Sequence, residues 1–386
     1  MLKLYNSGIE LKRLTNPPGH SFFGYYDLQP WDLTGRYHLC HKVNFWERLP
    51  EKNDVAELGM IGSHDLSFIP LAKTSAWNFQ QGAMLQWNPS NPTDEIIFNA
   101  RFGEHYRGVI KNIHTGSERL LDRPVANVDA FGRYALSINF DRMFDFRQGY
   151  GYAGVRDKHY NENHPDDDGI FLIDLNTGKS KLILSLNTIW ELMKSRFEID
   201  GDNKILINHI TFNNDGTRFI FLTRYFSDGI SWETSIGTAN TDGSDVFFLS
   251  GFTYASHYCW RDPQHILIHT KHNDRRHLCL MKDKTDNVEI MDDEFFKRDG
   301  HCSYSSDRQW ILYDSYPIEG YRELYLYSVK QRKGITLASF FSDPKAFRDI
   351  RCDLHPRFNR DGTLITLDST HEGGRHIYCM DISNLI

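Results

Sequence analysis

The sequence lacks the features that mark membrane-spanning and exported proteins. No uninterrupted apolar run in its 386 residues approaches the roughly 20 residues that a transmembrane helix needs. Its first residues, MLKLYNSGIELKRL, contain neither the apolar core nor the small-residue cleavage site of a signal peptide. We therefore expect a cytoplasmic protein that does not associate with a membrane.

Cysteine is scarce, and a strong charge of either sign is absent. The six cysteines lie far apart in the chain, which is typical of a reducing compartment, where a special cysteine is more often a metal ligand than a disulfide partner. The 44 basic and 51 acidic residues give a net charge of -7. Because a mildly acidic surface repels polyphosphate, we do not expect nucleic acid as a partner.

One short pattern, a turn followed by a strand-like run, recurs seven times. Examples are NNDGTRFIFLTR and NRDGTLITLDS. Asn-Gly and Asp-Gly pairs favour tight turns, and the β-branched and aromatic residues that follow them favour strands. Each copy has one short strand before it and one or two more after it. The copies begin at Asp32, Asn91, Ala130, Asn213, Arg261, Ser305 and Asn359.

Seven units of about four strands predict an all-β fold, a seven-bladed β-propeller, as one domain over residues 1–386. The last unit ends at RHIYCMDIS and lacks an outer strand. The N-terminal segment IELKRLT would supply this strand, close the last blade and remove an exposed sheet edge. A pair of β-sandwiches is the structural alternative, but it fits seven evenly built units poorly.

Two insertions, at about residues 141–168 and 185–200, interrupt the repeats. In the first, residues 166–168 (Asp-Asp-Asp) and Glu162 form either a calcium site or a solvated acidic loop. In the second, the apolar spacing predicts a helix over residues 185–197 that packs on a blade. Its expected buried face consists of Ile189, Leu192, Met193 and Phe197.

Four histidines take nearly the same place in four repeats. His209, His301 and His355 lie six residues before the aspartate in the turn, and His257 lies five residues before it. The same offset in the second repeat gives Gln86. Because the first strand of each propeller blade lines the central channel, we expect these side chains to meet at one mouth of the channel.

A cysteine accompanies the last of these histidines. Cys352 precedes His355 by three residues, and His301 lies on the neighbouring blade. Imidazole and thiolate together suit a borderline-soft divalent ion. We therefore expect His301, Cys352 and His355 to bind a divalent metal such as zinc. His257 is either the fourth ligand or a base beside the metal.

Arginines and aromatic residues gather near the same region. Arg351 and Arg357 either form solvated ion pairs with nearby aspartates or hold an anionic ligand through the guanidinium fork. In the first blade, Tyr26 either packs between blades like other aromatic residues of that segment or, with His20 and Asp27, reaches the rim of the channel, where flat rings stack on sugar faces.

The segments SHYCW (256–260), GHCSYSSD (300–307) and CDLHPRF (352–358) resemble the oligogalacturonate lyases and, more loosely, the propeller ulvan lyases. The likeness covers most of the chain as repeat architecture. It implies a seven-bladed propeller with a metal held by histidines and a glutamine, and a separate histidine as base. His257 matches the base motif T-H-x-x-W, His301 the S-H-x-x-S motif, and Cys352 with His355 the Q-x-x-H motif.

The sequence departs from the oligogalacturonate lyase pattern at two places. Cysteine stands in place of the glutamine, which favours zinc over manganese. The arginine that this family uses before an N-x-D-G-S turn corresponds to Ser235, so Arg224 or Arg351 would have to substitute for it. The ulvan lyases place catalytic residues in early and middle blades, which adds His105, Tyr150, Tyr152 and His209 as candidates.

The resemblance implies β-elimination on a uronic acid within an acidic oligosaccharide, in which the C5 proton is removed and the C4 oxygen is expelled. Histidine suits the base, and a metal or an arginine can neutralise the carboxylate. We expect His257 or His209 as base and Arg351 or the metal as neutralising group. The acid would be Tyr26 or Tyr152, and the substrate-binding candidates are His20, Gln86, His105, Arg224 and Arg357.

Two other functions fit the same repeats. A non-catalytic, TolB-like propeller would serve as a binding platform, and it predicts a rim without a metal-competent cluster. A glycoside hydrolase on this scaffold would need paired carboxylates, for which Asp27 and Asp353 are the candidates.

Overall fold

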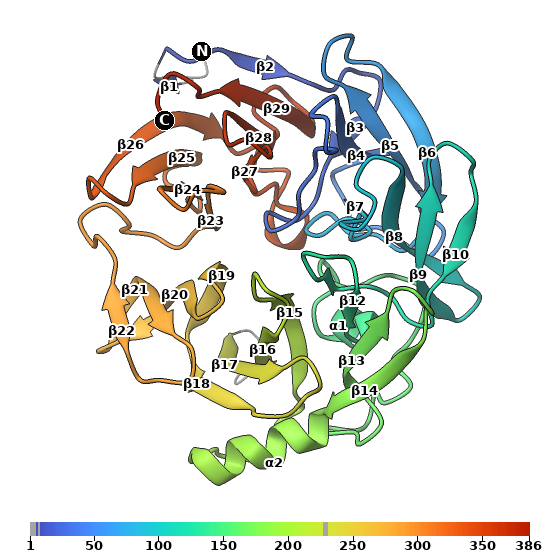
Figure 1. Cartoon of the computed structure of the whole chain (residues 1–386), viewed down its shortest axis with the longest axis vertical. Coiled ribbons are helices and arrows are strands. Elements are labelled where there is room, and N and C mark those ends of the chain that lie inside the picture. Colours follow the sequence, from blue (N-terminus) through green and yellow to red (C-terminus); the bar gives the residue numbers. More distant parts are fainter. Residues whose placement is uncertain (1–4, 7, 227–230) are drawn as a thin grey trace.

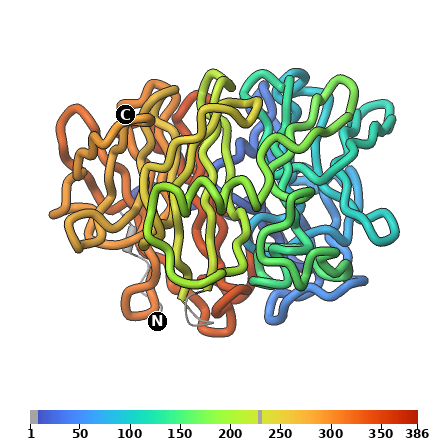
Figure 2. The backbone as a smooth tube through the Cα atoms, turned by 90° about the horizontal axis from the view of Figure 1, so that it is seen from below, coloured from blue at the N-terminus to red at the C-terminus, as the bar shows by residue number. Residues whose placement is uncertain are grey.

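A computed structural model describes residues 5–6, 8–226 and 231–386, and it forms a ring of seven antiparallel sheets around a central channel (Figure 1). In each sheet, or blade, the first strand lies nearest the channel. The all-β, seven-bladed propeller expected from the repeats is therefore confirmed. Seen edge-on, the strands run between the two faces of a thick disc (Figure 2).

The blades follow one another along the chain. The first three blades consist of β3 (His20–Phe22), β4 (Tyr37–Val43), β5 (Ala56–Gly62) and β6 (Phe68–Thr74); β7 (Gln86–Trp87), β8 (Glu95–Phe102), β9 (His105–Asn112) and β10 (Glu118–Leu120); and β11 (Asn127–Val128), β12 (Tyr134–Ser137), β13 (Gly169–Asp174) and β14 (Ser180–Ser185). Blades 4 and 5 consist of β15 (Leu206–Phe212), β16 (Arg218–Phe226), β17 (Trp232–Asn240) and β18 (Phe247–Thr253); and β19 (Ala255–Asp262), β20 (His265–His272), β21 (Arg275–Lys282) and β22 (Val288–Ile290). Blades 6 and 7 contain β23 (Cys302–Tyr304), β24 (Trp310–Asp314), β25 (Tyr321–Ser328) and β26 (Lys333–Phe341); and β27 (Arg357–Phe358), β28 (Leu364–Ser369) and β29 (His376–Asp381).

The N-terminal segment closes the ring. Strand β2 (Leu11–Arg13) pairs antiparallel with β29, with Leu11 opposite Met380 and Arg13 opposite Tyr378. The expected closure of the last blade by the N-terminal strand is thus confirmed. In addition, β1 (Tyr5–Asn6) pairs with β26 and makes blade 6 five-stranded, which the sequence did not indicate.

A shared side-chain hydrogen bond explains why the turns repeat. The carboxylate of Asp32 accepts a hydrogen bond from the backbone N–H of Tyr37, five residues further on, at 2.9 Å. This bond satisfies a backbone donor inside the turn and fixes where the next strand begins. The same five-residue bond is made by Asp129, Asn213, Ser305 and Asn359.

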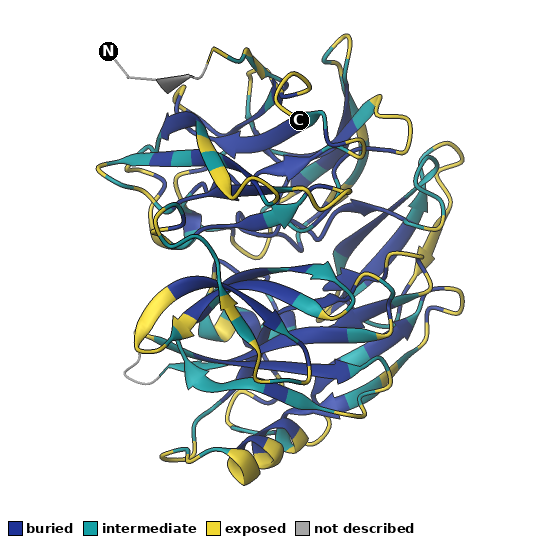
Figure 3. Ribbon diagram, turned by 60° about the vertical axis from the view of Figure 1, so that its left-hand side comes forward, coloured by how far each residue is buried: buried dark blue, intermediate teal, exposed yellow. Residues whose placement is uncertain are grey.

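The apolar side chains of the strands pack mainly between neighbouring blades. Figure 3 shows that the strands are largely buried, whereas the exposed residues concentrate in the loops and on one helix. Between blades 6 and 7, for example, Leu312, Leu337, Ile365 and Leu367 are fully buried in one cluster. Since burying such a side chain stabilises a fold by about 1.5–3 kcal/mol, each blade depends on its neighbours for its core.

Both insertions contain a helix. α1 (Phe140–Phe146) begins at Asn139, whose side chain accepts hydrogen bonds from two backbone N–H groups. α2 (Leu186–Arg196) begins at Ser185, as predicted, and runs along the outside of the ring (Figures 1 and 2). No helix in the described part of the chain is long and apolar enough to cross a membrane.

The buried face of α2 differs from the expected one at one position. Leu192 was expected on the buried face but is 37 % exposed. Leu186 and Trp190, and likewise Ile189 and Met193, are spaced four residues apart, so the two pairs form the buried face and leave Leu192 on the other side. The Trp190 ring stacks on the ring of His164, 4.2 Å away, and this contact anchors the helix to the first insertion.

Two histidines of β4 are buried in the neutral form. His38 Nε2 lies 3.2 Å from Thr366 Oγ1 in blade 7, and His41 Nε2 accepts a hydrogen bond from the backbone N–H of Ala83 at 2.9 Å. Burial lowers the pKa of both side chains to about 3. A proton on either ring would place a charge in a buried position, so acid opposes the packing of blade 1.

The fold should therefore lose stability as the pH falls from 7 to 5. Below pH 6.5 each of these histidines takes up a proton only on unfolding, which removes about 1.4 kcal/mol per pH unit for each group until its folded pKa of about 3 is reached. Urea unfolding at pH 7, 6 and 5 measures this slope. His38→Gln should make the slope shallower, whereas His64→Gln, on an exposed residue, should leave it unchanged. A stability that does not change over this range would contradict the prediction.

Candidate functional site

The four histidines singled out by the repeats lie around one tyrosine in the channel. The ring centre of Tyr26 is 5.0 Å from that of His301 and 5.7 Å from that of His209. The corresponding distances to His355 and His257 are 6.0 and 6.1 Å. Residues separated by up to 146 positions, from His209 to His355, are thus brought together by the ring.

The backbone is irregular where it presents these side chains. The pairing of β15 with β16 shifts register around His209, and that of β19 with β20 shifts around His257. Such bulges re-aim a side chain. His209 and His355 also have left-handed backbone angles, with φ of 53° and 41°. For a residue other than glycine this costs about 1–3 kcal/mol, and such strain is concentrated at functional sites.

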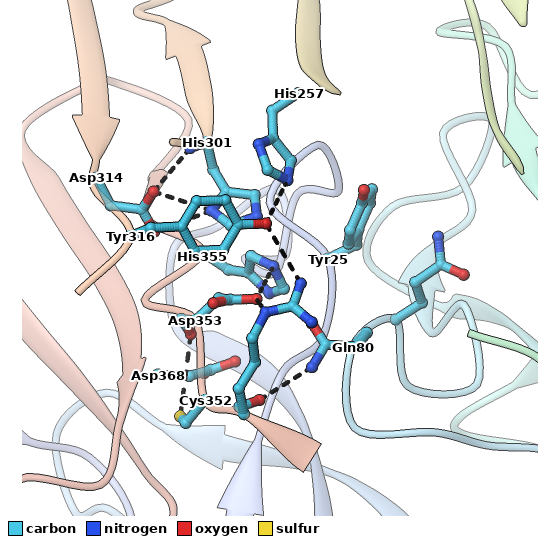
Figure 4. Close-up of polar contacts among 12 residues, drawn as sticks. Tyr25, Gln80, His257, His301, Asp314, Tyr316, Cys352, Asp353, His355 and Asp368 are labelled. Atoms are coloured by element: carbon cyan, nitrogen blue, oxygen red, sulfur yellow. Dashed lines mark hydrogen bonds and ion pairs between the residues drawn. The ribbon is translucent and has the colours of Figure 1, made fainter. Parts of the chain in front are cut away.

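His257 forms a buried pair with a carboxylate. Its Nδ1 lies 3.0 Å from Asp299 Oδ1, and its Nε2 lies 3.4 Å from the hydroxyl of Tyr316 (Figure 4). Burial opposes ionisation of Asp299, but His257, His269 and Tyr254 outweigh it and hold the pKa of the carboxyl well below its usual value. The ionised carboxylate keeps the proton on Nδ1 and leaves Nε2 as the acceptor.

Tyr316 belongs to a chain of polar contacts that continues through an arginine. Its hydroxyl is 3.5 Å from Arg351 Nη2, which also donates to the hydroxyl of Tyr150 at 2.7 Å. Arg351 Nε lies 2.8 Å from Asp353, and Gln80 donates to the Arg351 carbonyl at 2.9 Å. Sequence reasoning missed Tyr316, Asp299 and Gln80, because they lie on loops outside the repeated register.

A cavity of about 330 Å³ opens beside His257. Its wall is rich in arginine, tyrosine and histidine, so it is polar and cationic. The side chains that bear on its chemistry are Tyr25, Arg147, Tyr150, His209, Arg224, His257, Arg276, Asp299 and Tyr316.

Arg224 is a partly buried cation of this cavity with few polar partners among the described residues. Its guanidinium donates to Asn208 Oδ1 at 2.6 Å and to the Ala255 carbonyl at 3.2 Å, and its buried Nε has no hydrogen-bond partner. Among the described residues no carboxylate lies within ion-pair distance of it, and burial lowers its pKa. Arg147, by contrast, is paired with Asp349 at 2.7 Å. An anionic ligand would neutralise Arg224.

Arg224 lies close to Ser235, the residue that stands where the oligogalacturonate lyases have an arginine. In the pairing of β16 with β17, Thr223 lies opposite Ser235 and Arg224 lies opposite Thr234. The guanidinium thus comes from the strand next to the one that carries Ser235. A substitution of this kind was one of the two alternatives raised by the sequence.

Three side chains next to His257 could hold a divalent metal. Potential ligand atoms of His301, Asp353 and His355 all lie within 4.8 Å of one another. The buried Nε2 atoms of both histidines have no hydrogen-bond partner. Their Nδ1 atoms are held from behind, at 2.9 Å by the carboxylate of Asp314 and at 2.8 Å by the carbonyl of Gly24. Second-shell contacts of this kind orient imidazoles that bind metals.

The charge states of this group also suit a metal. Burial, and then neighbouring histidines, hold the pKa of His301 and of His355 well below its usual value, so both rings are neutral and can act as ligands. Burial opposes ionisation of Asp353, but Arg351 and Arg322 outweigh it and hold the pKa of its carboxyl low. Two imidazole nitrogens and a carboxylate oxygen form a donor set that fits a divalent transition metal.

The structure does not bring Cys352 or His257 into this group. The Cys352 thiol is buried in the core, and burial raises its pKa to about 11. The residue of this segment whose ligand atom lies within 4.8 Å of those of His301 and His355 is instead Asp353. Both nitrogens of His257 face other groups, Asp299 and Tyr316.

The two tyrosines expected as acids are engaged elsewhere. Tyr26 donates its hydroxyl proton to the carbonyl of Tyr258 at 2.8 Å and accepts from the N–H of the same residue at 3.0 Å. Tyr152 is fully buried, with its hydroxyl bonded to Asn99 at 2.9 Å and its ring stacked on Phe140 at 4.5 Å. Neither hydroxyl is free to protonate a ligand in the cavity.

Of the five substrate-binding candidates, only Arg224 lines the cavity beside His257. The other four lie elsewhere: His20 packs against Trp46, Gln86 donates to the Met84 carbonyl, His105 is exposed at the start of β9, and Arg357 pairs with Asp368. Arg357 and Asp27 line a separate cavity of about 450 Å³, formed by the opposite ends of the inner strands.

The acidic run of the first insertion does not form an open calcium site. Asp167 is ion-paired with Lys158 at 2.8 Å and with His159 at 2.7 Å. Asp168 accepts from Asn139 at 2.7 Å, and Asp166 accepts from Asn187 at 2.8 Å. The three carboxylates thus point to different protein partners.

Comparisons with solved structures show proteins of the same architecture. An oligogalacturonate lyase in complex with manganese aligns with a TM-score of 0.71 and 14 % identity, over 99 % of this chain and 96 % of that one. An oligogalacturonate lyase from Vibrio parahaemolyticus aligns with a TM-score of 0.68 and 13 % identity, over 98 % and 96 %. A prolyl endopeptidase aligns with a TM-score of 0.54 and 8 % identity, over 95 % of this chain and 47 % of its own.

These comparisons confirm the resemblance to oligogalacturonate lyases at the level of the fold, over nearly the whole chain. No protein-family model matches the sequence, and no curated protein sequence matches it. The function must therefore be argued from the site itself.

The geometry predicts which substitutions abolish metal binding. After dialysis against zinc or manganese and removal of free metal, elemental analysis should find bound metal in the wild type and in Cys352→Ser. His301→Ala and Asp353→Asn should lose it, because each removes one of the three converging ligands. Retention of metal by both of these variants, or its loss from Cys352→Ser alone, would contradict the assignment.

Proposed function

We propose that the protein is a lyase that cleaves a uronic-acid-containing oligosaccharide by β-elimination. The observation that carries the proposal is the presence, in one cavity, of the His257–Asp299 pair and the half-buried guanidinium of Arg224. The first group can remove a proton, and the second can hold the carboxylate next to the carbon that loses it. The fold shared with oligogalacturonate lyases supports this chemistry.

Arg224 binds the substrate carboxylate. The hydrogen on C5 of a uronate is only weakly acidic, because the neighbouring carboxylate already bears a negative charge. A guanidinium fork lowers the cost of adding further negative charge as C5 is deprotonated. Since burial already disfavours the charged form of Arg224, an incoming carboxylate stabilises this residue as well.

His257 is the base. Asp299 holds its Nδ1–H and directs Nε2 toward Tyr316 and the cavity. Asp299 and Arg351 are positioning residues: the first fixes the tautomer of His257, and the second contacts the hydroxyls of Tyr316 and Tyr150. His209, the alternative base, packs against the ring of Tyr25 at 4.7 Å between ring centres, and its Nε2 lies 3.2 Å from Asp27.

Tyr316 is the acid that protonates the departing C4 oxygen. Burial raises the pKa of its hydroxyl well above the usual value, so the group carries its proton at neutral pH and can donate it. It replaces Tyr26 and Tyr152 in this role, since the hydroxyls of both are engaged in the protein interior.

We propose that His301, Asp353 and His355 hold a divalent metal beside the base. When bound, such an ion supplies Lewis-acid stabilisation of negative charge on the substrate. The expected preference for zinc depended on a thiolate ligand. With Asp353 in place of Cys352 the donor set suits manganese as well as zinc.

The six free cysteines support a reducing, cytoplasmic location.

The alternative functions have less support. A glycoside hydrolase needs a carboxylic acid whose pKa is raised, but Arg351 and Arg322 hold the pKa of Asp353 low, and Asp27 faces His209. A simple binding platform does not need a base oriented by a buried carboxylate.

Substitution of Arg224 should separate this proposal from the alternatives. Arg224→Ala should lower kcat/KM on a cleaved uronic oligosaccharide by about 10²–10³, because the charge that develops on the substrate loses its counter-ion. His257→Ala should lower it by about 10²–10⁴ through loss of the base. The assay follows the ultraviolet absorbance of the unsaturated product.

Arg308→Ala is the matched control for Arg224→Ala, since Arg308 lines the opposite mouth of the channel. It should retain wild-type kcat/KM. Wild-type activity in both Arg224→Ala and His257→Ala would refute the proposed mechanism.

A further inference from the structure

The base and the acid proposed above are neighbours. His257 Nε2 and the Tyr316 hydroxyl are 3.4 Å apart and line the same cavity. This distance limits the stereochemistry of the elimination, which the fold alone does not do. A β-elimination removes a hydrogen from C5 and an oxygen from C4, and these two substituents lie either on the same face of the sugar ring or on opposite faces.

We infer that the elimination is syn, and that the cleaved uronate carries its C5 hydrogen and C4 oxygen on the same face of the ring. This is the configuration of glucuronate and mannuronate. In galacturonate, guluronate and iduronate the two substituents lie on opposite faces. The inference rests on the proposed function and narrows its substrate class.

The distance over which a proton can be transferred decides between the two possibilities. A proton donor or acceptor works within about 2.6–3.2 Å of its target. If the base and the acid acted on opposite faces, the sugar ring would lie between them. Two proton-transfer distances of about 3 Å each would then place the two groups at least about 6 Å apart. Two groups 3.4 Å apart can serve one face only. The separation of the two catalytic carboxylates of glycosidases predicts stereochemistry by the same logic.

Neighbouring residues hold the side chains of both His257 and Tyr316 in position. Asp299 holds His257 from behind, and Arg351 contacts the Tyr316 hydroxyl at 3.5 Å. Tyr316 also lies just after β24, whose last residue, Asp314, holds His301. Figure 4 shows the Tyr316 hydroxyl directed at the imidazole of His257.

A second tyrosine, Tyr25, also lines this cavity, and its hydroxyl lies 3.4 Å from His209 Nδ1. An anti elimination with His257 as base would need an acid other than Tyr316, and Tyr25 is the candidate for that role. The two mechanisms therefore differ in which tyrosine is needed.

The syn arrangement also returns the site to its starting state. The C5–H bond breaks and its proton goes to His257 Nε2, while the electron pair forms the C4=C5 double bond. The C4–O bond breaks, and the departing oxygen takes the proton of Tyr316. The proton on His257 then passes directly to the Tyr316 phenolate across the 3.4 Å that separates them.

The first test is a panel of short oligosaccharides of glucuronate, mannuronate, galacturonate and guluronate, assayed by ultraviolet absorbance with the metal-loaded wild type. We expect product from glucuronate or mannuronate and none from the other two. Cleavage of galacturonate or guluronate would overturn the syn assignment but leave the lyase proposal intact. No cleavage of any of the four would remove the proposed function and the inference together.

The second test separates the two tyrosines on a cleaved substrate in deuterated water. Tyr316→Phe should lower product formation at least about 100-fold, while His257 still exchanges the C5 hydrogen, so the ratio of exchange to product rises. Tyr25→Phe should leave this ratio unchanged. A variant that merely misfolds loses both readouts. A raised ratio in Tyr25→Phe and not in Tyr316→Phe would show elimination across the ring and overturn the inference.

Discussion

The buried carboxylate of Asp353 is the charge on which the candidate site depends. Arg351 and Arg322 each approach it to 2.8 Å, and it faces the same side of its segment as His355. If one of the two arginines were removed, the buried carboxylate would be incompletely neutralised and would strongly destabilise the fold. The contacts among these three charged side chains must therefore form together. Arg351 is thereby fixed in the orientation that contacts the hydroxyls of Tyr150 and Tyr316.

The surroundings of this carboxylate have a local charge opposite to that of the chain. The protein carries a net charge of -7, yet Arg147, Arg224 and Arg276 line the cavity beside His257. A low-dielectric cleft lined by one sign of charge concentrates its field on what enters. An anion that enters this cavity is therefore attracted before it makes any specific contact.

The fold and the meeting of the four histidines could be predicted from the sequence because both follow from the repeat. A fixed turn sets where each inner strand begins, and any residue at a fixed offset from that turn must face the channel. Asp299 and Tyr316 could not be found this way, since they lie on loops whose lengths differ from blade to blade. The C-x-x-H spacing pointed to Cys352, but the structure brings Asp353 to His301 and His355 instead. The left-handed backbone at His355 means that spacing along the chain alone does not decide which neighbour its side chain meets.

The pairing of β1 with β26 and of β2 with β29 has a consequence for the assembly of the site. His301 enters blade 6 and His355 enters blade 7, so both side chains belong to the two blades whose outer edges β1 and β2 cover. These pairings join segments that are far apart in the chain, such as Leu11 and Met380. The approach of the two imidazoles therefore depends on long-range strand pairing as well as on the local structure of each blade.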